Sequence, residues 1–314
     1  MWPTEHATLS ELERARVVEA AEPALRALLA RDKIVATDVW EELVGVHVPL
    51  ASFIAARHAR RGGPLVVGIV GTQGSGKSTT TRWLACLLRA GFGLHAVPYA
   101  LDDFYLTAAE RAQLARDQHP LLGTRGVPGT HDVALGMRCL HALRGARAGE
   151  RVEMPVFQKA FDDRAHDTQS VVGPVDVVLF EGWCVGATPE TDAALQQPVN
   201  ALERERDADG RLRRFANAQL RGSYARWFAE LDALVMLRAP SFERVQTWRF
   251  EQEQKLAAIE PGAPALMTED QVRDFIAHYE RLTRHILREL PTLADVVLDL
   301  APNRRIERVS VKGP

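Results

Sequence analysis

The chain has 314 residues, of which 39 are basic and 41 are acidic, so its formal charge at neutral pH is −2. A nearly balanced charge argues against a protein that binds nucleic acid or anionic membranes through a broad cationic surface. With 46% hydrophobic and 25% charged residues, the composition is that of a folded globular chain. The length predicts about two domains, or one large α/β unit with additions.

Cysteine usage and the first residues indicate where such a protein works. Cys86, Cys139 and Cys184 are far apart and form no C-x-x-C pair, which favours a reducing compartment over a disulfide framework or a zinc site. Residues 1–22 mix acids and bases, so no secretory signal is visible. Since no apolar run approaches the ~20 residues of a membrane span, we expect a cytoplasmic protein that does not enter a membrane.

The N-terminal part of the chain has a helical pattern. Apolar residues recur at helical spacing over residues 9–31 and predict a helix that Pro23 breaks in two. A second helix is expected to run toward Arg61, where a Gly-Gly-Pro sequence follows. We therefore predict an N-terminal helical extension at 1–61 and a second domain at 62–314.

Beyond this boundary, short apolar runs alternate with longer amphipathic segments. Continuous apolar runs are typical of strands that are buried on both faces of a parallel sheet. The predicted strands are 65–70, 94–101, 175–180, 231–237 and 296–300. The predicted helices are 79–90, 132–147, 211–230, 242–259 and 269–290. The alternation predicts an α/β fold with a mostly parallel central sheet flanked by helices. A charge-dense stretch at 203–214 is expected to be a solvated loop and helix start.

A phosphate-binding motif begins where the first predicted strand ends. Residues 71–78 match G-x-x-x-x-G-K-[ST] in full. Glycine lets backbone N–H groups close on phosphate oxygens at a helix N-terminus, Lys77 can contact the β- and γ-phosphates, and Ser78 can ligate Mg²⁺. The predicted nucleotide-binding residues are Gly71, Thr72, Gln73, Gly74, Ser75, Gly76, Lys77, Ser78 and Thr79. Because a strand precedes the motif and a helix follows it, the motif favours an ATP and Mg²⁺ site over a chance glycine-rich turn.

The motif alone does not separate a kinase from a GTPase, an ATPase motor or a transporter subunit. The chain contains no Asn-Lys-x-Asp sequence, so the usual guanine-recognition motif is missing. It also contains no Leu-Ser-Gly-Gly stretch of the kind that suggests a transporter ATPase. A nucleotide-binding regulator without catalytic activity stays open on this evidence.

Acidic residues follow two of the later predicted strands. Asp102 and Asp103 end the second strand, and a carboxylate at that edge of an open α/β sheet can accept a hydroxyl proton or hold a metal-bound water. A strand-end Asp that caps the next element is an equally good interpretation. Glu181 follows the third strand, in the position of a Walker-B-type acid, and is predicted to coordinate Mg²⁺ indirectly, whereas Ser78 ligates it.

Several further motifs follow in order along the chain. They are Leu-Asp-Asp-Phe-Tyr-Leu-Thr at 101–107, Arg-Gly-Val-Pro-Gly-Thr-His-Asp at 125–132, Met-Pro-Val-Phe-Gln-Lys at 154–159, Phe-Glu-Gly-Trp at 180–183 and Trp-Arg-Phe-Glu-Gln-Glu at 248–253. With this set the chain resembles the D-glycerate 3-kinase family, within the group of P-loop kinases that contains uridine kinase, phosphoribulokinase and bacterial pantothenate kinase. Residues 198–227 resemble a bacterial branch of that family.

The resemblance implies roles for individual residues. Asp102 matches the acid that is taken as the base for the acceptor hydroxyl, and Arg249 matches an arginine on a lid helix that covers the phosphates. The implied catalytic residues are Lys77, Asp102 and Arg249. The residues implied to bind the acceptor, a small hydroxy acid, are Asp103, Tyr105, Arg125, His131, Asp132, Lys159 and Arg164.

Structural roles remain open for several of these residues. Asp132 could cap the following helix, and Arg249 lies among glutamates, as in a surface helix with ion pairs. Lys159 and Arg164 lie in a loop where a solvated basic residue is expected. A carboxylate substrate, however, needs cationic partners, and Arg125 together with these two residues can supply them.

The sequence therefore predicts an ATP- and Mg²⁺-dependent kinase, and the resemblance implies that D-glycerate is phosphorylated at its primary hydroxyl. Another small acceptor, such as a nucleoside, pantothenate or a polyol, would use the same phosphate loop and Asp102. A non-catalytic ATP-binding regulator is the alternative outside the enzymes. Lysine usage supports a local anion site, because only five of the 39 basic residues are lysines and both Lys77 and Lys159 fall within the motifs. A compact ammonium and a planar guanidinium are not interchangeable under a tight phosphate loop.

Overall fold

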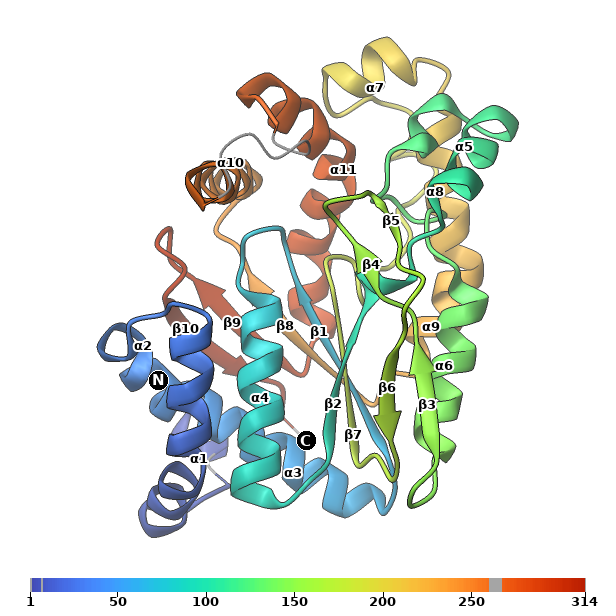
Figure 1. Cartoon of the computed structure of the whole chain (residues 1–314). Helices are drawn as coiled ribbons and strands as arrows, with labels where there is room; N and C mark the ends of the chain where they lie inside the picture. The colour runs from blue at the N-terminus through green and yellow to red at the C-terminus, as the bar shows by residue number, and fades with distance from the viewer. Residues whose placement is uncertain (1, 7, 260–266, 314) are drawn as a thin grey trace.

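A central β-sheet runs through the molecule (Figure 1), which is a computed structural model describing residues 2–6, 8–259 and 267–313. Within these residues the sheet has six strands in the order β10-β9-β8-β1-β7-β2. They are β1 (Leu65–Gly71), β2 (Ala96–Ala100), β7 (Val177–Gly182), β8 (Ala233–Arg238), β9 (Val296–Leu300) and β10 (Ile306–Val311). Neighbouring strands are parallel except β10, which is antiparallel to β9. The predicted α/β fold with a mostly parallel sheet is confirmed.

The inner strands are apolar over their whole length because both faces of the sheet are covered. Every residue of β1 and β7 is buried, as expected for strands between two layers of helices. Val70 of β1 lies opposite Gly182, and Ala100 of β2 lies opposite Glu181. The carboxyl ends of these strands therefore meet at one edge of the sheet, which is where ligands bind in open α/β folds.

Helices pack on both faces of this sheet. The helices after β1 are α4 (Lys77–Phe92), α5 (Ala108–Asp117), α6 (Val133–Gly145), α7 (Ala201–Arg206), α8 (Arg211–Gln219), α9 (Ala225–Phe228), α10 (Phe242–Ile259) and α11 (Glu269–Leu293). The crossover connections between parallel strands place α4 on one face and α6, α9 and α11 on the other (Figure 1). A π-helical turn, η5 (Leu220–Tyr224), joins α8 to α9, so the predicted helix 211–230 is interrupted.

Four short strands lie beside the sheet, and the sequence analysis did not predict them. β3 (Arg151–Met154) pairs with β6 (Gln169–Val172), and β4 (Phe157–Gln158) pairs with β5 (Asp163–Arg164). β10 was also missed. These strands are short or polar and lie at edges, so they lack the continuous apolar runs that identified the inner strands.

The N-terminal extension packs against α4 (Figure 1). It consists of η1 (Thr4–His6), α1 (Glu11–Arg31), α2 (Ala36–Glu42), the π-helical turn η2 (Leu43–His47) and α3 (Val48–Arg61). The prediction that Pro23 breaks α1 is wrong, because the helix runs through it. Pro23 lies on the exposed side of the helix. The buried side at helical spacing, which holds the helix on α4, is formed by Val17, Ala21, Leu25 and Leu29.

The helical stretch from α2 to α3 contradicts the prediction that no apolar segment approaches the length of a membrane span. Residues Ala36–Arg61 form a helix that is long and apolar enough, by length and composition alone, to cross a membrane. Such a helix is weak evidence for a membrane segment, because 56% of its apolar window is buried inside the protein. Arg57 forms an ion pair with Asp295, and Arg61 forms one with Asp232, just before β9 and β8. The ion pairs and the burial of this helix are those of a helix that packs into the protein core.

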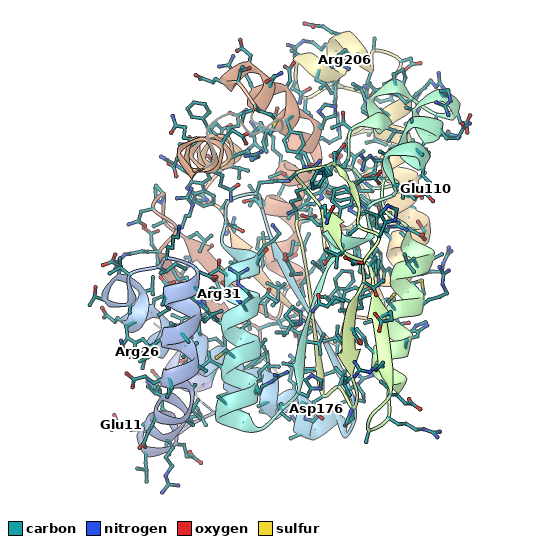
Figure 2. All side chains as sticks on the ribbon, in the orientation of Figure 1. Glu11, Arg26, Arg31, Glu110, Asp176 and Arg206 are labelled. Carbon is teal, nitrogen blue, oxygen red and sulfur yellow. The ribbon has the colours of Figure 1, made fainter. Side chains whose placement is uncertain are left out.

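Charged side chains cover the outside of the molecule, in keeping with the arginine-rich composition. Glu11, Arg26 and Arg206 project away from the body of the protein (Figure 2). Exposed pairs such as Arg26 with Glu22, separated by one helical turn, are worth only about 0–1 kcal/mol each. Fewer charged side chains are buried, among them Arg111, Glu181 and Asp207.

Candidate active site

The phosphate loop follows β1 and ends at the first turn of α4. Gly74 and Gly76 have left-handed backbone conformations, with φ of 76° and 88°, which glycine adopts without the cost that other residues incur. A Cβ atom on Gly74 would lie 2.7 Å from Cβ of Trp248. Gly74 is therefore required both by its backbone conformation and by the close approach of α10.

The residues of this loop suit a phosphate and its metal. The Thr72 and Ser75 hydroxyls are buried and have no hydrogen-bond partner among the described residues. Ser78 Oγ donates a 2.6 Å hydrogen bond to Glu181 Oε1 of β7. A hydroxyl beside a carboxylate at the start of the phosphate-loop helix is the donor set that Mg²⁺ prefers. Ser78 and Glu181 thus lie together as predicted, and their role in holding Mg²⁺ stays a prediction.

Asp102 lies on a 3₁₀ turn, η3 (Leu101–Phe104), directly after β2. Its Oδ2 atom is 2.7 Å from Nζ of Lys159, which stands on the turn between β4 and β5. Burial opposes ionisation of Asp102, but the charges of Lys159 and Lys77 outweigh it and hold the pKa of this carboxyl well below its ordinary value. Asp102 is therefore a carboxylate at neutral pH and lies between the phosphate loop and the β4–β5 turn.

The neighbouring Asp103 has the opposite environment. Its Oδ1 accepts a 3.0 Å hydrogen bond from the backbone N–H of Phe157. Burial, with a further contribution from the charge of Asp102, raises the pKa of Asp103 to about 6. Two adjacent acids are thus separated into one that stays ionised and one that takes up a proton in mildly acidic solution. Asp103 fixes β4 beside the site.

Arginine side chains gather next to these acids, and each of them already contacts an acid of the chain. Arg125 and Arg111 both form ion pairs with Asp162 on the β4–β5 turn. Arg164 donates to the backbone oxygen of Tyr105 at 2.9 Å. Its guanidinium also lies 3.9 Å from a carboxylate oxygen of Asp132. The structure therefore brings the predicted cations together and supplies each with an internal counter-charge.

Two of these residues have roles that sequence reasoning missed. Arg111 is only 1% exposed, although in the sequence it is one charged residue among several in α5. Asp162 has a φ of 52°, which is uncommon for a residue other than glycine. The sequence contains no signal that distinguishes either one, because their importance comes from burial and from a turn conformation.

Asp132 has a structural role at the start of α6, and the neighbouring His131 is a candidate for binding the acceptor. Asp132 Oδ1 accepts a 2.9 Å hydrogen bond from the N–H of Leu135, so Asp132 is the N-cap of α6. The His131 ring is buried and stacks on Tyr105 with 4.2 Å between ring centroids. Burial lowers the pKa of His131 to about 3, so its imidazole is neutral. Tyr105 is equally buried, and the structure shows it packing against His131.

The predicted lid arginine lies on α10, which is seen end-on beside the phosphate loop in Figure 1. Arg249 Nη1 is 2.7 Å from Glu253 Oε2, one turn further along α10. Trp248 is fully buried against Gly74. Arg304 Nε donates to the carbonyl oxygen of Gly74 at 2.9 Å. The helix is thus packed on the phosphate loop, while a contact of Arg249 with phosphate stays a prediction.

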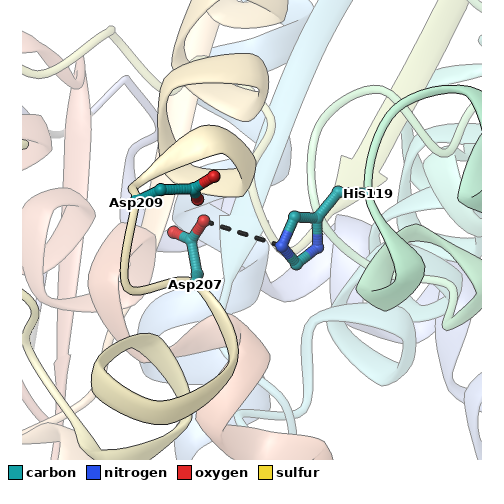
Figure 3. A group of neighbouring side chains, drawn as sticks. All are labelled: His119, Asp207 and Asp209. Carbon is teal, nitrogen blue, oxygen red and sulfur yellow. Dashed lines mark ion pairs between the residues drawn. The ribbon is translucent and has the colours of Figure 1, made fainter.

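A second group of titratable side chains lies away from this site. His119, Asp207 and Asp209 approach one another as metal ligands could (Figure 3). Asp207, however, accepts hydrogen bonds from the N–H of Leu212 and, at 3.0 Å, from Nη1 of Arg213. The Asp207 carboxylate is therefore already paired with a guanidinium. The group stabilises the start of α8, and the prediction that residues 203–214 are simply solvated is wrong, since Asp207 is only 1% exposed.

The fold and the site together define a P-loop kinase, and a comparison with solved structures agrees. The structure of D-glycerate 3-kinase from Cryptococcus neoformans var. grubii matches with a TM-score of 0.70 and 29% sequence identity. The match covers 84% of this chain and 98% of that one.

The sequence comparisons define the family. No family model matches the chain. The chain is 34% identical over 241 residues to the uncharacterized kinase mug58 of Schizosaccharomyces pombe, over 73% of this chain and 83% of that protein. It is 31% identical over 226 residues to the chloroplastic D-glycerate 3-kinase of Arabidopsis thaliana, over 69% of this chain but only 46% of the plant protein. The chain belongs to the glycerate 3-kinase family of P-loop kinases.

Proposed function

We propose that this kinase transfers the γ-phosphoryl group of ATP to the primary hydroxyl of D-glycerate and forms 3-phosphoglycerate. The observation that carries the proposal is the ionised Asp102, which lies between the phosphate loop and a cluster of cationic side chains. A hydroxy acid needs both partners, a carboxylate for its hydroxyl and cations for its own carboxylate. The names of two relatives are consistent with this acceptor.

The nucleotide is assigned to the phosphate loop. Backbone N–H groups of the loop would hold the phosphate oxygens at the positive end of α4, and Lys77 would contact the β- and γ-phosphates. Ser78 and Glu181 would hold Mg²⁺, which when bound neutralises the charge on the phosphate oxygens. Arg249 would add a second positive charge at the phosphates, after its ion pair with Glu253 has been replaced by a contact with phosphate.

The acceptor hydroxyl is assigned to Asp102. The hydroxyl oxygen forms a new bond to the γ-phosphorus as the bond from that phosphorus to the bridging oxygen of ADP breaks. The hydroxyl proton passes to the Asp102 carboxylate, and ADP leaves with the bond's electron pair. Phosphoryl transfer depends more on alignment than on a strong base. A carboxylate whose pKa is held low by two lysines can therefore serve as the group that orients the hydroxyl.

The acceptor carboxylate is assigned to the neighbouring cations. An arginine fork binds a carboxylate through two parallel hydrogen bonds, and Arg125 has this geometry available. At present Arg125 pairs with Asp162, whose side chain is 49% exposed. A substrate carboxylate can replace an exposed partner at lower cost than a buried one. Arg164 and Lys159 complete the positive rim of the acceptor position.

An acceptor screen tests the proposal. Purified full-length protein with ATP and Mg²⁺ is offered D-glycerate, L-glycerate, pantothenate, uridine and glycerol, and ADP release is followed by a coupled assay. We expect release with D-glycerate and a product that phosphorus NMR identifies as the 3-phosphate. The Lys77→Met variant controls for contaminating kinases. Turnover with a different acceptor, and not with D-glycerate, would contradict the proposed substrate. ATP binding without turnover of any acceptor would favour a non-catalytic regulator.

A further inference from the structure

His131 has one ring nitrogen with a partner and one without. Its Nδ1 atom lies 2.5 Å from the hydroxyl oxygen of Tyr224. Its Nε2 atom is buried and has no hydrogen-bond partner among the residues that the structure describes. A buried polar atom without a partner costs free energy, so this orientation of the ring needs an explanation beyond packing.

The hydroxyl of Tyr224 decides which nitrogen carries the proton. Tyr224 is fully buried in the π-helical turn η5, and such turns are often found at functional sites. Its oxygen accepts a 3.0 Å hydrogen bond from the N–H of Gly129. The hydroxyl hydrogen must therefore be donated elsewhere, and His131 Nδ1 is the acceptor within reach. Burial also raises the pKa of Tyr224 well above its ordinary value, so the hydroxyl keeps this hydrogen.

A neutral imidazole carries a single ring proton. If Nδ1 accepts from Tyr224, the proton is on Nε2, which becomes a hydrogen-bond donor. Asp102 lies close enough for its charge to act on the pKa of His131. His131 is also held by a bridge to Tyr105, which follows the Asp102 turn. The donor nitrogen thus belongs to the neighbourhood of the acceptor hydroxyl.

We propose that Tyr224 is a positioning residue, which fixes the Nε2–H tautomer of His131 so that this N–H donates to an oxygen of the bound acceptor. The ligand class is a small molecule with a hydroxyl or carboxylate oxygen beside the hydroxyl that is phosphorylated. The kinetic part of this proposal rests on the proposed function, whereas the tautomer does not. No motif of the sequence identified Tyr224.

Packing is the competing explanation, because Tyr224 belongs to an aromatic cluster. Its ring centroid lies 5.8 Å from that of Phe228 and 6.3 Å from that of Trp227. Tyr224→Phe keeps the ring and removes only the hydroxyl. Tyr99→Phe is the matched control, since Tyr99 is 1% exposed, packs on the same Trp227 and donates to a backbone oxygen at 2.6 Å.

The tautomer is measured first, without any substrate. Nitrogen NMR of histidine-labelled full-length protein distinguishes a protonated from an unprotonated ring nitrogen, and His131→Gln assigns the signal. We expect Nε2–H in the natural protein and in Tyr99→Phe, and a mixture of tautomers in Tyr224→Phe. A proton on Nδ1 in the natural protein would overturn the proposal, even if Tyr224→Phe does not fold.

The kinetics then test whether the donor is used. We expect Tyr224→Phe to raise the KM for the acceptor about tenfold, as for one lost hydrogen bond, with the KM for ATP unchanged. Tyr99→Phe should leave both constants unchanged. In the His131→Gln background, Tyr224→Phe should have no further effect, because the two residues act as one unit. Additive effects, or equal changes in both KM values, would show a merely structural Tyr224. A protein with the expected tautomer but no turnover would instead contradict the proposed function.

Discussion

The two halves of the site are built in different ways. The loop of the nucleotide half is one continuous segment from Gly71 to Thr79, and its expected binding groups are backbone N–H groups set by glycine conformations, together with the Lys77 and Ser78 side chains. The acceptor half is assembled from η3, α5, the segment before α6, the β4–β5 turn and η5. Its binding groups are side chains, and nearly all of them already have a partner within the chain.

This difference explains how each half can be specific. Backbone groups in a glycine-rich loop offer the same donors whatever surrounds them, so we expect the loop to bind the phosphates that all nucleotides share. Paired side chains must exchange an internal partner for the substrate, so only a molecule with matching charges gains by entering. Lys159 with Asp102 and Arg125 with Asp162 are two such pairs. We therefore expect selectivity for the acceptor to depend on these ion pairs.

The largest expected effect belongs to the acid where the two halves meet. Asp102→Asn removes the carboxylate that orients the acceptor hydroxyl, and a positioned base contributes about 10²–10⁴-fold. We expect kcat to fall about 10³-fold, measured by coupled ADP release, while the affinity for ATP measured by calorimetry changes little.

Asp117→Asn is the control for this prediction, because Asp117 is exposed and its recorded partner is the side chain of Gln113. It should leave kcat unchanged. If Asp102→Asn kept more than a tenth of the activity, Asp102 would not orient the hydroxyl and the two halves would not meet there.

The next largest effect tests the glycine loop of the nucleotide half. Gly74→Ala introduces a left-handed alanine, at about 1–2 kcal/mol, and a Cβ atom 2.7 Å from Trp248, at about 1–3 kcal/mol. We expect the free energy of unfolding in urea, without nucleotide, to fall by about 2–5 kcal/mol. Gly76→Ala has the same backbone cost but no atom within 4 Å of its Cβ, so it should lose only about 1–2 kcal/mol. Equal losses would mean that α10 does not press on the loop.

The two halves of the site also differ in how much of each could be predicted from the sequence. The inner strands and the bounds of α10 followed from apolar runs and helical periodicity, and the phosphate loop followed from its own residues. These features are local, since neighbouring residues determine them. The unbroken α1 was missed because a proline on the exposed side of a helix does not interrupt it here. The edge strand β10 was missed because it lacks a continuous apolar run.

Within the site, sequence reasoning named the acids and the cations but could not pair them. Lys159 is predicted to bind the acceptor, with a solvated loop side chain as the alternative, and the structure shows it in an ion pair with Asp102. Arg111 and Asp162 had no signal, because an ion pair between residues 51 positions apart leaves no local pattern. Motifs therefore identify the residue types, and the tertiary structure decides their partners.

A smaller effect, seen in pH dependence, tests the acceptor half. The pKa of Asp103 is about 6 in the folded state against an ordinary value of 3.8. Between these two pKa values the folded state binds more protons than the unfolded state does. The stabilising contribution of Asp103 is therefore fully present below the ordinary pKa and is lost as the pH rises through about 6. Asp103→Asn removes this loss while its amide oxygen can still accept from Phe157. We expect the variant to match the natural protein near pH 4 and to be about 3 kcal/mol more stable above pH 7.

Urea unfolding at a series of pH values measures this difference. Asp102→Asn is the contrasting variant, because the pKa of Asp102 is lowered in the folded state and its stabilisation is lost as the pH falls. That variant should be destabilised at neutral pH. If both variants shifted stability in the same direction, the two adjacent acids would not have the opposite environments that the structure shows.

The smallest expected effect concerns the exchange of partners on Arg125. Asp162→Asn removes the carboxylate that competes with the substrate for this guanidinium, and an exposed ion pair is worth about 0–1 kcal/mol. We expect the KM for D-glycerate to fall about threefold with the KM for ATP unchanged. Asp163→Asn is the matched control, because Asp163 accepts from the backbone N–H groups of Ala108 and Arg164, whereas the ion pair of Arg125 is with Asp162. A rise in KM would mean that Asp162 orders Arg125 for the substrate, and selectivity would then depend on a preformed cationic site and not on exchange.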